Sequence, residues 1–194
     1  MLDAVNRALR AEAPPGRRAI QLYYILKLLA ASAEARARSL EDALWDLAAE
    51  FYSSQVAGEP SRELFKEMES LAAQHRAYLK VGLASEWAAL LLESPPEASE
   101  RGYRVPLSLL AGVLSKLLEE IPEEAASLRL EVRAVLRLVS ELEPGWLGET
   151  GGSELSVFGE VLEKAERLAR RRAPPVMVLG QKPGSTHPGG GRRF

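Results

Sequence analysis

The stretch AIQLYYILKLLAASA, at residues 19–33, decides the predicted fold. Only Gln21, Lys27 and Ser32 interrupt its run of apolar side chains. A helix that is apolar around most of its circumference needs packing partners on several sides. We therefore expect this stretch to form the central helix of a helical bundle and to run as far as Arg38.

Apolar residues at helical spacing predict further helices on both sides of this stretch. These helices are expected at residues 2–12, 40–56, 61–93, 107–121, 122–142 and 154–172. Ser39 and Asp42 have the spacing of a capping box, so Ser39 is expected to start the helix at 40–56. The prediction is an all-α bundle of about seven helices with a flexible C-terminal tail.

The domain organisation follows from where proline, glycine and serine gather. Residues 1–172 are expected to form one helical bundle domain, and the Pro- and Ser-rich loop at 94–106 is a candidate subdomain boundary. Residues 145–153 are predicted to be a Gly-rich linker, because the loop lacks the ending of a phosphate-binding loop. Residues 173–194 are predicted to be a disordered basic tail.

Composition excludes several classes of protein. The chain of 194 residues has no cysteine, which excludes disulfides, thiolate catalysis and thiolate zinc sites. Its first residues lack the apolar core and cleavage site of a secretory signal. No apolar stretch is long enough to span a bilayer. We therefore expect a soluble, cytoplasmic protein with no membrane partner.

The net charge of −2 conceals an asymmetry along the chain. Residues 164–194 hold eight basic residues and one acidic residue, a net charge of +7, which leaves −9 on residues 1–163. An acidic body with a basic end predicts attraction to an anionic partner.

Two candidate groups for chemistry were tested against the sequence. His75 and His187 are the only histidines, and neither lies in a catalytic or metal-binding motif, so His75 is interpreted as a structural residue. The acidic pairs Glu119-Glu120 and Glu123-Glu124 flank Pro122 and could hold a divalent ion. The simpler interpretation is that Glu123 and Glu124 stabilise a helix N-terminus.

Arg129, Arg133 and Arg137 repeat every four residues on one side of a predicted helix. Such a ridge could contact successive phosphates of a nucleic acid. The alternative is a solvated helix face, with Glu131 and Glu141 nearby.

The C-terminal end supplies a second basic group. It comprises Arg167, Arg170, Arg171, Arg172, Lys182, Arg192 and Arg193. The helix dipole accounts for some of these cations, but three consecutive arginines before a basic tail exceed that need. We expect this group to bind either nucleic acid or an acidic protein surface.

These observations predict a non-catalytic helical interaction subunit of a larger assembly, without a cofactor or metal. The bundle would bind a protein partner, the basic C-terminus would bind an anionic partner, and an oligomer is compatible with both. One alternative is an enzyme with a site of carboxylates or His75 between helices.

A further alternative comes from the sequence LAAEFY at residues 47–52, which precedes a long predicted helix. It resembles the Leu-rich segment with an acidic-Phe-Tyr turn in GINS subunits of the archaeal replicative helicase. The resemblance implies a helical subunit of a replication complex. It covers a short part of the chain, and residues 144–194 lack the strand pattern of the small β domain of that family.

Overall fold

The computed structural model describes residues 1–10, 15–58, 61–93, 107–141 and 152–175. These residues form six α-helices and one 3₁₀ turn, with no strand among them. The elements are α1 (Leu2–Arg10), α2 (Pro15–Val56), α3 (Arg62–Glu93), α5 (Leu107–Glu120), η1 (Glu123–Ala125), α6 (Ala126–Ser140) and α7 (Gly152–Arg172). The all-α class is confirmed, with six α-helices in place of the expected seven.

The difference in helix number arises at Ser39, which lies inside α2 and does not start a new helix. The predicted helices at 19–38 and 40–56 are one continuous helix. Residues 33–43, AEARARSLEDA, contain no glycine or proline and consist mainly of good helix formers. Buried or half-buried residues also continue at helical spacing across this point, at Ala33, Ala37, Leu40 and Leu44. Continuing the helix therefore keeps one packed face, which a break at Ser39 would interrupt.

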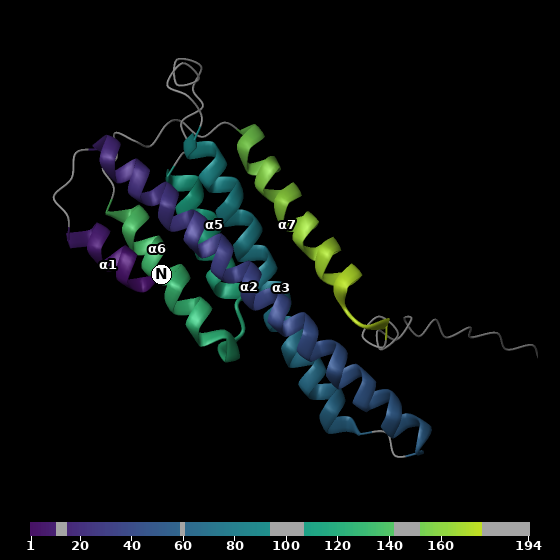
Figure 1. Cartoon of the computed structure of the whole chain (residues 1–194). Coiled ribbons are helices and arrows are strands. Elements are labelled where there is room, and N and C mark those ends of the chain that lie inside the picture. Colours follow the sequence, from purple (N-terminus) through teal and green to yellow (C-terminus); the bar gives the residue numbers. More distant parts are fainter. Residues whose placement is uncertain (11–14, 59–60, 94–106, 142–151, 176–194) are drawn as a thin grey trace, which may run out of the picture.

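α2 and α3 form a long antiparallel hairpin that organises the molecule (Figure 1). Gly82 of α3 lies against Ala30 and Ala33 of α2, and a Cβ atom added at Gly82 would lie 3.5 Å from the Cβ of Ala33. Small residues on both helices permit this close approach. Gly82 thus marks a place where α2 and α3 meet closely.

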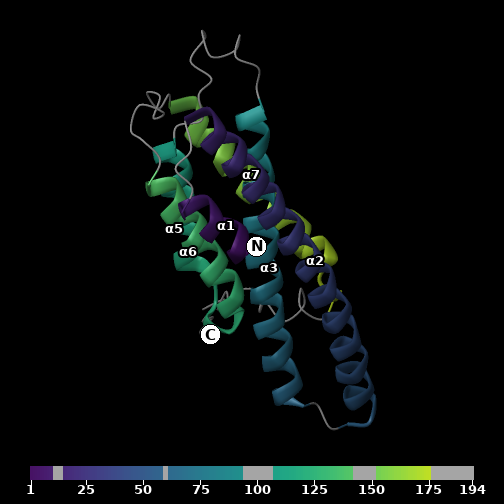
Figure 2. The same ribbon diagram turned by 60° about the vertical axis from the view of Figure 1, so that its left-hand side comes forward.

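The other helices cover one half of this hairpin (Figures 1 and 2). α5 and α6 pack together, with α1 against α6, while α7 packs along α3. The Tyr78 hydroxyl of α3 and the Ser127 hydroxyl of α6 are hydrogen-bonded at 3.0 Å. Most buried side chains of these helices belong to one large core that includes Leu26, Leu114 and Leu128.

The second half of the hairpin extends beyond the other helices as an arm, which we define as residues 43–58 and 61–72 (Figure 2). The arm has its own small core of Leu44, Ala48, Phe51 and Met68. Its turn is followed by Ser61, whose hydroxyl accepts a hydrogen bond from the Leu64 amide at 3.2 Å. Ser61 therefore caps the N-terminus of α3.

Several expectations concern residues outside the described ranges. The candidate boundary at 94–106, most of the predicted linker at 145–153 and residues 176–194 of the predicted tail belong to this group. Among the helices that the structure describes, none has an apolar stretch long enough to cross a lipid bilayer.

Candidate functional site

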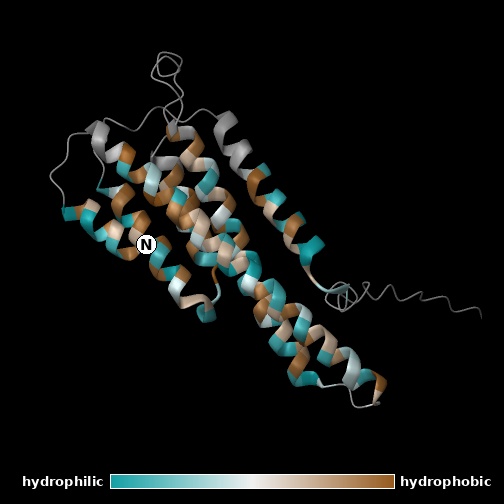
Figure 3. Cartoon of the chain, viewed as in Figure 1, coloured by the Kyte–Doolittle hydropathy of each residue, from teal (hydrophilic) through white to brown (hydrophobic). Residues whose placement is uncertain are grey.

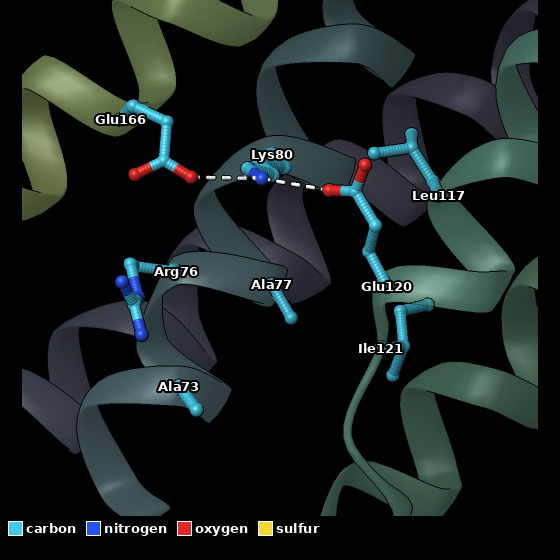
Figure 4. A pocket seen from close by; sticks show the side chains of 8 residues that line it. All are labelled: Ala73, Arg76, Ala77, Lys80, Leu117, Glu120, Ile121 and Glu166. Atoms are coloured by element: carbon cyan, nitrogen blue, oxygen red, sulfur yellow. Dashed lines mark hydrogen bonds and ion pairs between the residues drawn. The ribbon is translucent and has the colours of Figure 1, made fainter. Parts of the chain in front are cut away.

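A cavity of about 230 Å³ lies between α3, α5 and α7 (Figure 4). Its lining side chains are Ala73, Arg76, Ala77, Lys80, Leu117, Glu120, Ile121 and Glu166. Lys80 is central, because its Nζ atom donates to Glu120 Oε2 at 2.7 Å and reaches Glu166 Oε1 at 2.8 Å. One ammonium group therefore joins three helices.

The charges in this cavity stabilise one another. Burial alone would lower the pKa of Lys80, but the hydrogen bonds and negative charges of Glu120 and Glu166 raise it above its ordinary value. Burial alone would raise the pKa of Glu166, but Lys80, together with Arg76 and Arg170, holds it below its ordinary value. A lysine held in its charged form is unsuited to act as a nucleophile or base. These ion pairs hold α3, α5 and α7 together, and we name the group of Lys80, Glu120 and Glu166 the Lys80 clamp.

His75 lies on α3 and is 1 % exposed. Burial, followed by the positive charges of Arg172 and Arg76, lowers its pKa from 6.5 to about 4. Its Nε2 atom has no hydrogen-bond partner among the described residues. The charged groups that shift its pKa, Arg172 and Arg76, are both basic. Within the described ranges, no three His, Asp or Glu side chains gather in a way that could hold a metal ion.

The arginine ridge on α6 lies where the sequence predicts it, but two of its members have partners. Arg129 is half-buried and donates to the Ile121 carbonyl oxygen at 3.5 Å. Arg137 pairs with Glu141 at 3.0 Å between Nε and Oε1. Arg133 is exposed and makes no ion pair within the described part of the chain.

The basic residues at the end of α7 are more exposed than the arginine ridge on α6. Arg167, Arg170 and Arg171 are exposed, whereas Arg172 turns towards α2 and lies 3.5 Å from Glu41. This contact places the end of α7 beside the base of the arm (Figures 1 and 2). Figures 1 and 2 also show α6 and α7 on different sides of the α2–α3 hairpin. Lys182, Arg192 and Arg193 lie outside the described residues.

A hollow near the tip of the arm was not predicted from the sequence. It has a volume of about 420 Å³ and is lined by Phe51, Ser61, Arg62, Phe65, Lys66 and Glu69. The rings of Phe51 and Phe65 contact each other, with centroids 5.9 Å apart. Phe51 and Phe65 come from different helices, and spacing within one helix does not indicate that they meet.

The face of α2 that points away from the bundle is more exposed than the sequence predicts. α2 packs against α1, α3 and α6, as a central helix should. However, Tyr24 is 62 % exposed and Leu28 is 49 % exposed, and the arm exposes Trp45, Tyr52 and Val56. Figure 3 shows hydrophobic and hydrophilic residues interspersed along the coloured part of α2. The apolar circumference that predicted burial on several sides is therefore in part a solvent-facing surface.

Comparisons of this chain with protein-family models, curated protein sequences and solved structures found no match.

Proposed function

We propose that this chain is a non-catalytic helical interaction subunit, in which the hollow of the arm binds a protein partner. The observation that carries the proposal is the pair of contacting phenylalanines, Phe51 and Phe65, in a hollow rimmed by Arg62, Lys66 and Glu69. An apolar floor with a charged rim has the composition of a protein-binding site, where aromatic side chains supply most of the affinity.

The basic end of α7 supplies a second contact in this proposal. Arg167, Arg170 and Arg171 are exposed next to the base of the arm, so one large partner could contact both the hollow and these arginines. A nucleic acid or an acidic protein surface would satisfy their charge. The residues that follow α7, with Lys182, Arg192 and Arg193, would extend the same contact.

The protein partner can be tested by affinity isolation of the full chain from its native source. We expect Lys66→Glu and Phe65→Ala to release a co-purifying protein that the unmodified chain retains. Lys116→Glu is a matched control, because Lys116 is exposed on α5, away from the hollow. If every variant retains the same proteins, the hollow is not the binding site.

The anionic partner can be tested by binding to duplex DNA and single-stranded RNA over a series of salt concentrations. We expect deletion of residues 173–194, or the substitutions Arg170→Glu and Arg171→Glu, to weaken binding and flatten its salt dependence. Arg7→Glu, on the exposed side of α1, is the control, and Arg133→Glu tests the α6 ridge separately. Equal affinity in the deletion and the full chain would remove the tail from the proposal.

A further inference from the structure

Part of the exposed surface of α2 follows a seven-residue repeat. From Tyr24 to Val56, ten exposed positions lie at alternating spacings of four and three residues. They are flanked by other exposed positions, namely Glu34, Arg36, Ser39, Asp46, Glu50, Ser53 and Gln55. These ten positions, which we name the outer seam, are Tyr24, Leu28, Ala31, Ala35, Arg38, Asp42, Trp45, Ala49, Tyr52 and Val56. All ten are exposed, and only Arg38 and Asp42 are charged.

This spacing is that of the a and d positions of a coiled coil. Any solvated helix face has positions at this spacing, but charged residues are favoured there, whereas eight of these ten residues are uncharged. The buried face of α2 already packs against the bundle through other residues, including Leu22, Leu29 and Ala33. The outer seam is thus a second apolar face, about five heptads long, on a helix whose first face is occupied.

The outer seam can pair with a second copy of itself that runs in the opposite direction. If two copies of α2 run antiparallel with a two-fold axis beside Leu40, each a position meets a d position of the other copy, as in antiparallel coiled coils. The facing pairs are then Tyr24 with Val56, Leu28 with Tyr52, Ala31 with Ala49, Ala35 with Trp45 and Arg38 with Asp42.

Charge and size both agree with this register. The two charged residues of the outer seam are opposite in sign. In the dimer Arg38 of each copy faces Asp42 of the other copy, so the interface contains two such ion pairs. Asp42 has no ion pair within the described residues, and Arg38 pairs with Glu34 of its own helix. The largest side chain, Trp45, faces the small Ala35, which gives its ring room to pack.

We propose that the chain forms an antiparallel homodimer through the outer seam of α2. The surface differs from the hollow and from the basic end of α7, so the dimer does not depend on the function proposed above. In the dimer the arm of each copy lies along the body half of α2 of the other copy.

The oligomeric state of the full chain tests this dimer directly. Sedimentation or light scattering over a range of micromolar concentrations should show a dimer, and Leu28→Glu should weaken it by at least about 100-fold, because the seam would bury an unpaired charge. Leu130→Glu is the matched control: Leu130 is 54 % exposed on α6 and lies outside the seam, so this variant should remain a dimer. Circular dichroism should show both variants folded, since both residues are exposed.

The pairing register has its own test. Asp42→Arg should separate the copies, and adding Arg38→Asp in the same chain should restore the dimer by exchanging the two charges. Because the chain has no cysteine, introduced thiols report contacts without interference. Mixed Ala31→Cys and Ala49→Cys chains should form a disulfide with each other in preference to self-pairing.

Three outcomes would overturn the proposal. A chain that is monomeric at every concentration has no such dimer, and its outer seam would belong to a different partner. A dimer that survives Leu28→Glu uses another surface. Efficient self-pairing of Ala31→Cys chains, without pairing to Ala49→Cys chains, would indicate a parallel arrangement in place of the antiparallel one.

Discussion

At the scale of single residues, His75 makes stability depend on pH. Its pKa is about 4 in the folded chain and 6.5 in the ordinary state, so between these values the unfolded chain binds a proton that the folded chain does not. Stability from this group is therefore intact above about pH 6.5 and falls as the pH drops towards 4. At about pH 5 the expected loss is about 2 kcal/mol relative to pH 7.

Denaturant unfolding at about pH 7 and pH 5 measures this loss. His75→Leu should remove most of the difference between the two pH values, because leucine cannot take up a proton. The carboxylates and His187 are the same in both proteins, so their contributions cancel when the two are compared. Equal pH dependence in the variant and the parent would contradict the predicted role of burial at His75.

Lys80 is the other residue whose charge matters to the fold. Lys80→Met should lower the free energy of unfolding by about 1–3 kcal/mol, because it leaves Glu120 and Glu166 without their shared partner. Glu166→Gln should cost less, since Lys80 keeps its bond to Glu120. Lys116→Met, at an exposed site on α5, is the control and should change little. A similar effect of Lys80→Met and Lys116→Met would mean that the clamp contributes nothing.

At the scale of helices, the meeting of α2 and α3 at Gly82 limits the size of the residue there. Gly82→Ala should stabilise the chain by up to about 1 kcal/mol, because alanine favours the helix and its Cβ would make an ordinary contact with Ala33. Gly82→Leu should destabilise it by forcing the helices apart. At Gly112, which has open space around it, both substitutions should be tolerated. Thermal melting of the four variants checks this contrast.

Local spacing predicted the helices well where one face is buried. The face of α6 formed by Leu128, Val132, Val135 and Val139 is buried as predicted, and α3 spans nearly its predicted range. The break at Ser39 was wrong because a capping pattern was given more weight than an unbroken packed face. Leu90 of α3 is exposed although it lies within an apolar run.

The candidate sites were harder to predict than the helices. The Lys80 clamp joins residues from three helices, and periodicity within one helix gives no information about such contacts. The hollow likewise combines residues of two helices, Phe51 of α2 and Phe65 of α3. The described members of the predicted basic groups can be placed, but their binding role stays a prediction.

At the scale of the whole molecule, the two cores predict two levels of stability. The body buries a large cluster shared by five α-helices, α1 to α3, α5 and α6, with a contribution from α7. The arm depends on four buried side chains and two helices. Local unfolding requires the least free energy where few apolar contacts are lost. The arm should therefore open more often than the body, while the body stays folded.

Amide hydrogen exchange of the Leu28→Glu variant, in which the proposed dimer is absent, measures this difference in a single copy. Amides in residues 44–55 and 65–72 should exchange faster than those in residues 77–89 and 128–139. Phe51→Ala should speed exchange in the arm with little effect on the body, because Phe51 belongs to the small core. Leu114→Ala, in the large core, should destabilise the body by about 2–5 kcal/mol and so speed exchange across the whole chain. If Phe51→Ala accelerates exchange equally in both regions, the arm and the body unfold as one unit, and the two cores are a single cooperative structure.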